Sequence, residues 1–199
     1  MCTRGSPFAA MRFALLAAIH CLAQARPTPG RCHLQGRLVG EVHGLLERMG
    51  GRFPPECLGD VVAIAAPTAA FRSNGTKRNA GVERAVYHTL TSIDFLFGND
   101  TVPVSWDGRT VEDFQNIVYR QIDESKCVAS RAQASEADFK DRRRLLGLYF
   151  DRLASVLQEK EFSACAWEVV RRELLQTLKF ILNNTLGHLF WARRRRNFH

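Results

Sequence analysis

The sequence lacks the short motifs that mark common enzyme sites. It has no G-x-S-x-G, H-E-x-x-H or P-loop motif, and no convincing pair of carboxylates. Four of its histidines, His33, His43, His88 and His188, are scattered and fit surface or packing positions better than a catalytic set. We therefore predict that the protein is not an enzyme and needs no cofactor.

Metal-ligand spacings and long apolar runs are also missing. No C-x-x-C or H-x-x-x-H pair occurs, so a zinc site is not expected. Beyond the N-terminus, no run reaches the ~20 apolar residues that a bilayer-spanning helix needs. We expect no stable insertion into a membrane.

The N-terminus carries the pattern of a secretory signal peptide. Arg4 and Arg12 are the only charges before an apolar run over residues 13–23, and a small-x-small sequence ends at Ala25. The run is too short for a membrane anchor. We predict that residues 1–25 are removed and that the remaining chain is secreted and extracellular, with its net charge lowered from +8 to +6 by the loss of two arginines.

Positive charge is concentrated at the C-terminus, where Arg193 to Arg196 follow one another. Such a block can bind nucleic acid, heparan-type polyanions or anionic membranes, but it is more often a solvated end. Secretion argues against a nucleic-acid partner. We treat residues 193–199 as a basic tail that follows the folded domain, residues 26–192.

Apolar residues recur at three- and four-residue spacing through most of the domain, and no convincing alternating strand pattern occurs. This pattern predicts an all-helical bundle. Five helices are expected, over residues 34–49, 82–97, 110–122, 135–156 and 163–181. Residues 50–79 form a long, partly apolar connection, which should pack on the bundle.

The connection lengths predict the directions of the helices. The last three links are short, so the helices they join should be antiparallel, whereas the long first connection can return the chain to its starting end. The first, second, third and fifth helices then form an up-up-down-down core. Four cysteines remain after signal removal, and an even number in a secreted chain suggests disulfides. Only one of their three pairings joins matching ends of the bundle: Cys32–Cys127 with Cys57–Cys165.

The start of the last predicted helix carries a family resemblance. Residues Cys165 to Leu175 read CAWEVVRRELL, which resembles the signature of type I interferons at this place. The order and spacing of the four cysteines match as well. Other stretches are similar to the fish-type members with four cysteines: MGGRFPPECL, SIDFLFGND and VEDFQNIVYRQIDESKC. The resemblance covers nearly all of residues 32–192.

The resemblance implies a secreted antiviral cytokine with a five-helix class II helical cytokine fold. Such proteins bridge two different chains of a class II cytokine receptor and trigger JAK-STAT signalling in innate immunity. They carry no catalytic residues and no cofactor. We expect this chain to act as a monomer with a heteromeric receptor as its partner.

The resemblance also places receptor contacts on the long connection and the last helix. By position these are Leu58, Asp60, Arg171, Arg172, Leu175, Gln176 and Lys179. We expect Arg171, Arg172 and Lys179 to face outward, so that reversing the charge at Arg171 or Arg172 weakens receptor binding without lowering the melting temperature. Trp167 fits the apolar stripe and should lie in the core. Glu168 fits a structural role near the start of the helix dipole.

Three N-x-S/T sequons predict glycosylation, at Asn74, Asn99 and Asn183. Two other functions fit parts of the sequence. One is a secreted helical cytokine with a different receptor pair. The other is a cationic, directly antimicrobial protein, which the arginine run supports; removing the tail would separate this activity from receptor signalling.

Overall fold

The computed structural model describes residues 32–73, 80–98, 101–130, 136–185 and 187–190. Within these ranges the chain is helical, with no β-strand beyond a single bridge pair. This confirms the predicted all-helical fold. The main helices are α2 (Gly36–Gly50), α3 (Ala80–Phe97), α4 (Gly108–Glu124), α6 (Glu136–Glu159) and α7 (Ala164–Asn184). The predicted signal peptide, the arginine run, Asn74 and Asn99 lie outside the described residues.

Contacts at the helix ends show that α4 runs antiparallel to α2. A disulfide joins Cys32, just before α2, to Cys127, which follows α4. At the other end, the backbone N–H of Asp107 donates to the carbonyl of Met49 across 3.3 Å. The first predicted disulfide is therefore present, and it lies at the end of the bundle where α2 begins.

The last helix also runs antiparallel to α2, and it is tied to α2 near both ends. The second predicted disulfide, Cys57–Cys165, joins the connection after α2 to the start of α7. Beyond the end of α7, Phe190 accepts a backbone hydrogen bond from Gly36 at 2.9 Å and donates one to Leu34 at 2.8 Å. The start of α2 and the segment after α7 consequently lie side by side.

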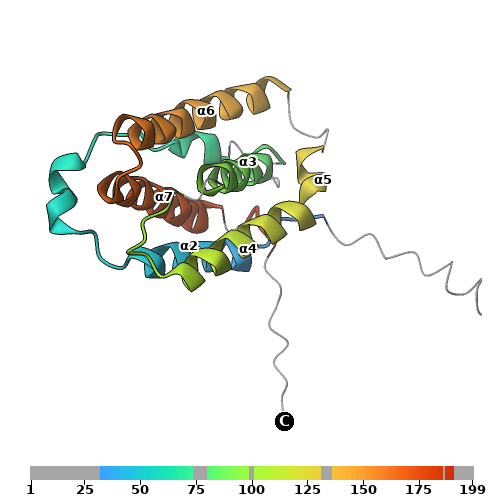
Figure 1. Ribbon diagram of the computed structural model, residues 1–199. Coiled ribbons are helices and arrows are strands. Elements are labelled where there is room, and N and C mark those ends of the chain that lie inside the picture. The colour runs from blue at the N-terminus through green and yellow to red at the C-terminus, as the bar shows by residue number, and fades with distance from the viewer. Residues whose placement is uncertain (1–31, 74–79, 99–100, 131–135, 186, 191–199) are drawn as a thin grey trace, which may run out of the picture. The chain divides into compact units, whose positions relative to one another are not determined.

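Helices α3 and α6 run in the same direction as α2. His33 Nδ1 lies 3.1 Å from Oε1 of Glu83, which places the start of α3 beside the start of α2. Phe139, near the start of α6, packs against Arg84 near the start of α3. The core of α2, α3, α4 and α7 is thus up-up-down-down, as predicted, with α6 on the far side of α3 and α7 from α2 and α4 (Figure 1).

The long connection after α2 contains structure that the sequence pattern did not predict. Two short 3-10 helices occur in it, η1 (Pro55–Asp60) and η2 (Thr68–Phe71). Elsewhere in the chain, a four-residue helix α5 (Lys126–Ala129) follows α4 and was also not predicted. The connection runs past the start of α7 and then packs between α6 and α3 (cyan to green in Figure 1). Its apolar residues lie on the bundle, as expected, with Phe71 1% exposed.

Aromatic side chains from four segments fill the core near the start of α7. The ring of Phe97 lies 4.8 Å from that of Phe114 and 5.1 Å from that of Trp167, measured between centroids. Trp106 packs edge-on against Trp167 at 5.9 Å. Trp167 is fully buried, as its place in the apolar stripe predicted. Because large aromatic side chains dominate core energetics, this cluster anchors the first turn of α7.

Candidate functional site

A buried arginine on α7 caps the end of α2. Helix α2 ends at Gly50, and Gly51 then adopts a positive φ of 62°. The last carbonyls of a helix have no partner within the helix. Arg171 supplies one: its Nη1 donates to the carbonyls of Leu46 and Glu47 at 3.3 Å, and its Nη2 donates to that of Gly51 at 3.0 Å.

Glu168 balances the charge of Arg171 inside the protein. Its Oε2 accepts from Arg171 Nη2 at 2.7 Å and from Nε at 3.0 Å. Its Oε1 accepts from the indole N–H of Trp106 at 2.6 Å. All three residues are at most 5% exposed. A buried charge is tolerated only when it is paired and hydrogen-bonded, and here both conditions hold. The cluster links α7, the end of α2 and the segment before α4.

The expected outward orientation of Arg171 is wrong. The side chain is 2% exposed and offers no surface for direct contact with a receptor. Arg171 follows Trp167 by four residues and precedes Leu174 by three, so at 100° per residue it lies on the same buried face. Its role is to hold the end of α2 against α7. Glu168 has the structural role predicted for it, although its partners are Arg171 and Trp106.

The other α7 positions predicted to contact a receptor gather around one surface hollow. Arg172, Leu175, Gln176 and Lys179 line a cavity of about 280 Å³ together with Arg171, whose charge Glu168 balances, and with residues of α2 and the segment after it, namely His43, Glu47, Gly51 and Phe53. We call this cavity the α2/α7 hollow. Gln176 and Lys179 are exposed, whereas Arg172 and Leu175 are partly buried. Receptor contact at these positions remains a prediction.

The α2/α7 hollow combines an apolar wall with positive charge. The guanidinium carbon of Arg172 lies 5.7 Å from the ring centroid of Phe53, within the range of a cation–π contact. Burial lowers the pKa of His43; Glu47 opposes this shift and Lys179 reinforces it. His43 is therefore neutral at pH 7, and the charges of the hollow are those of Arg172, Lys179 and Glu47.

The two positions predicted on the long connection lie in η1, outside this hollow. Leu58 is 64% exposed and directly follows the disulfide-bonded Cys57. Asp60 pairs with Lys160, which lies just beyond the end of α6. The disulfide and the ion pair attach η1 to both α7 and the α6–α7 link. Leu58 is thus an apolar side chain presented to solvent on a segment held at two points.

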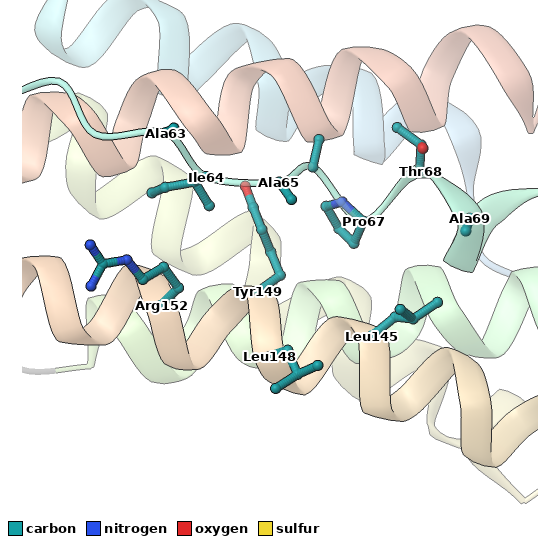
Figure 2. A pocket seen from close by; sticks show the side chains of 11 residues that line it. Ala63, Ile64, Ala65, Pro67, Thr68, Ala69, Leu145, Leu148, Tyr149 and Arg152 are labelled. Carbon is teal, nitrogen blue, oxygen red and sulfur yellow. The ribbon is translucent and has the colours of Figure 1, made fainter.

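The apolar residues that follow η1 form a second hollow against α6. Residues 63–69 and four α6 side chains surround about 390 Å³ of space, the α6 side chains being Leu145, Leu148, Tyr149 and Arg152 (Figure 2). The Tyr149 hydroxyl accepts a hydrogen bond from Thr177 of α7 at 2.9 Å. Burial raises the pKa of Tyr149, so the group stays neutral. The sequence pattern could not predict this hollow, because it depends on how residues 63–69 pack against α6.

Asn183 lies in the last turn of α7, and its side chain is exposed. Glycosylation there, and at Asn74 and Asn99, remains a prediction. Among the described helices, none combines the length and apolarity that crossing a bilayer would take.

The chain is similar to known proteins in both sequence and structure. Residues 33–186 match the family model described as the interferon alpha/beta domain. The chain is 30% identical to interferon alpha-1 of Equus caballus over 142 residues, which is 70% of this chain and 77% of that protein. It is 30% identical to interferon a3 of Oncorhynchus mykiss over 148 residues, or 74% and 78% of the two chains. The solved structure of zebrafish interferon 2 is 46% identical, with a TM-score of 0.72, over 76% of this chain and 99% of that one.

Proposed function

Because the chain belongs to the interferon alpha/beta family, whose members are cytokines and not enzymes, we propose that it is secreted, binds a receptor of two different class II cytokine-receptor chains and triggers JAK-STAT signalling. Antiviral and innate immune roles are typical of this family. Family membership favours this function over a different class of helical cytokine or a directly antimicrobial protein.

One observation carries the proposal for where a receptor chain binds. All five α7 positions carried over from the family line the α2/α7 hollow, next to residues of α2 and the segment after it, although Arg171 itself is only 2% exposed. Interface hot spots are enriched in arginine and aromatic residues and lie near pockets. Arg172, which contacts the ring of Phe53, and Leu175, which also lines the hollow, form a group of this kind. We propose that the hollow accepts an apolar side chain of the receptor, and that an acidic side chain lies next to it on the receptor.

The exposed Leu58 would make a second contact of the same receptor chain. The Cys57–Cys165 disulfide fixes η1 to the start of the helix that carries Arg172 and Lys179. A binding surface whose parts are held in place loses less conformational entropy when the partner binds. The disulfide would therefore support receptor affinity as well as stability.

Charge reversal tests this proposal. The double variant Arg172→Glu with Lys179→Glu should reduce STAT phosphorylation at least tenfold in cells of the source species, because it reverses the charge around the hollow. The matched control is Arg37→Glu with Arg120→Glu, two exposed arginines near the start of α2 and the end of α4. Both variants should keep the melting temperature of the unaltered protein. Equal potency of the two variants would refute the proposed surface.

A further inference from the structure

Basic and aromatic side chains gather where the first turns of α3 and α6 pack together. The guanidinium carbon of Arg84 lies 3.5 Å from the ring centroid of Phe139. The ring of His88, one turn further along α3, lies 5.4 Å from the same ring. On α6, Arg143 follows Phe139 by one turn and is exposed. Because both contact Phe139, the side chains of Arg84 and His88 lie near the start of the helix that carries Arg143.

Helix α6 adds two more exposed cations at this place, Lys140 and Arg144. The acidic residue between them in sequence, Asp141, is turned by roughly 160° from Arg143, but it lies about 60° from Arg144 at i,i+3 spacing and offsets part of the charge there. We call this group the α3/α6 basic cluster: Arg84, His88, Lys140, Arg143 and Arg144. It is separate from the α2/α7 hollow, since the two share no residue.

The charges in this cluster are not neutralised by two nearby acidic side chains, because those side chains are paired elsewhere. Glu83 contacts His33 at 3.1 Å, and Asp138 accepts from Arg142 at 2.8 Å. Within the described part of the chain, Nε of Arg84 has no hydrogen-bond partner. Burial lowers the pKa of His88, and Arg143 and Arg84 lower it further, so the ring is neutral at pH 7 and the charges of the cluster are those of Arg84, Lys140, Arg143 and Arg144.

We propose that the α3/α6 basic cluster binds a sulfated polysaccharide chain. Guanidinium groups match the oxygens of sulfate and phosphate groups in a bidentate arrangement, and arginine is the residue best suited to this contact. Cations on two neighbouring helices can engage successive sulfates of one linear chain. Lys140 and Arg144 alone cover about 6 Å along α6.

A sulfated polysaccharide fits this surface better than a nucleic acid does. Proteins that bind single-stranded RNA or DNA stack bases on exposed aromatic rings. Phe139 is 7% exposed and is covered by Arg84, so it offers no stacking surface. Phe95 is 79% exposed two turns beyond His88 on α3, and an RNA arm in the experiment tests whether it takes that role. The choice of a polysaccharide also rests on the proposed extracellular location.

The experiment measures binding of a size-defined heparin oligosaccharide to the secreted full chain by titration calorimetry. The test variant is Arg143→Gln with Arg144→Gln. The control is Arg109→Gln with Arg120→Gln, which removes the same charge from exposed positions of α4. Each is made with Arg193 to Arg196 intact and with all four replaced by serine, because the arginine run could bind the same probe. Thermal unfolding confirms that each variant is folded.

We expect the test variant to bind the oligosaccharide at least tenfold more weakly in both backgrounds, with the control within about twofold of the unaltered protein. The proposal is overturned if the test variant binds like the control, or if only replacement of the arginine run abolishes binding. It is also overturned if an RNA oligonucleotide of equal charge binds more tightly than heparin and depends on the same two arginines. The titration with heparin involves no receptor, so failure here is distinct from failure of the proposed receptor site.

Discussion

The Nε atom of Arg171 lies 2.5 Å from the position that a Cβ atom on Gly50 would occupy. Real Cβ atoms essentially never approach so closely, so the guanidinium can reach the end of α2 only because Gly50 has no side chain. The two glycines that end α2 therefore have different roles. Gly51 supplies the positive φ after the helix, whereas Gly50 supplies the space for Arg171.

The first prediction concerns this close approach. Gly50→Ala should lower the free energy of unfolding by about 1–3 kcal/mol, because the buried side chains of Arg171 and Glu168 must shift to admit a methyl group. Gly147→Ala is the matched control, since nothing lies within 4 Å of its added Cβ in the middle of α6. That change should raise stability by about 0.5–1 kcal/mol, the usual helix gain of alanine over glycine. Chemical denaturation measures both, and equal effects at the two positions would contradict the geometry.

The second prediction compares adjacent arginines on α7. Arg171→Ala should cost about 3–5 kcal/mol of stability, because it leaves the buried carboxylate of Glu168 without its cation. Arg172→Ala should change stability by less than about 1 kcal/mol, since its side chain is partly solvated. Thermal unfolding at pH 7 separates the two. A melting temperature for Arg171→Ala equal to that of the unaltered protein would refute the capping role.

The third prediction concerns pH. Burial raises the pKa of Glu173 on α7, and Arg172 partly offsets this shift. The folded protein then holds this proton more tightly than the unfolded chain does. The resulting stability is present below the unfolded pKa, about 4.3, and is lost as the pH rises through the higher folded value.

Glu173→Gln should therefore raise the free energy of unfolding at pH 7 by on the order of 1 kcal/mol, with the gain vanishing below about pH 4. Glu112→Gln, at an exposed position of α4, is the control and should show no such pH-dependent gain. Denaturant titrations across this pH range measure the difference. A constant offset between Glu173→Gln and the unaltered protein would assign the effect to packing instead.

The fourth prediction distinguishes the two disulfides. Replacing either cysteine pair with serine should cost about 2–5 kcal/mol. Only loss of Cys57–Cys165 should also weaken receptor binding among the molecules that remain folded, because this bond holds η1 and Leu58 beside α7. Loss of Cys32–Cys127 acts at the opposite end of the bundle. Receptor affinity measured well below each melting temperature, on samples mapped by non-reducing peptide analysis, gives the comparison, and an equal loss of affinity in both variants would count against it.

Local patterns in the sequence predicted the helices and their order well. Helical periodicity placed α2, α3, α4, α6 and α7, and Ser163, a residue type that favours the N-cap position, accepts from the backbone N–H of Ala166 at the start of α7. The lengths of the connections predicted the helix directions, and these in turn predicted both disulfides. The two 3-10 helices were missed because turns of four to six residues leave too short a pattern to detect.

The burial of Arg171 was not predicted from local sequence patterns. The spacing from Trp167 and Leu174 already placed Arg171 on the inner face, but its charge favoured the opposite interpretation. Burial of Arg171 depends on its counter-ion Glu168, which accepts a hydrogen bond from Trp106, a loop residue 62 positions away from Glu168 in sequence. Such a contact depends on tertiary packing, so only the folded structure could reveal it.

The paired backbone hydrogen bonds of Phe190 with Leu34 and Gly36 make the folded chain nearly a closed ring. A short linker there could join the two ends, and the chain could be opened at another loop as a circular permutant with every helix kept in place. The junction lies at the start of α2, about 10 Å along that helix from His43, the nearest α2 residue in the lining of the α2/α7 hollow. A dye or a surface tether attached at that junction would leave the hollow accessible.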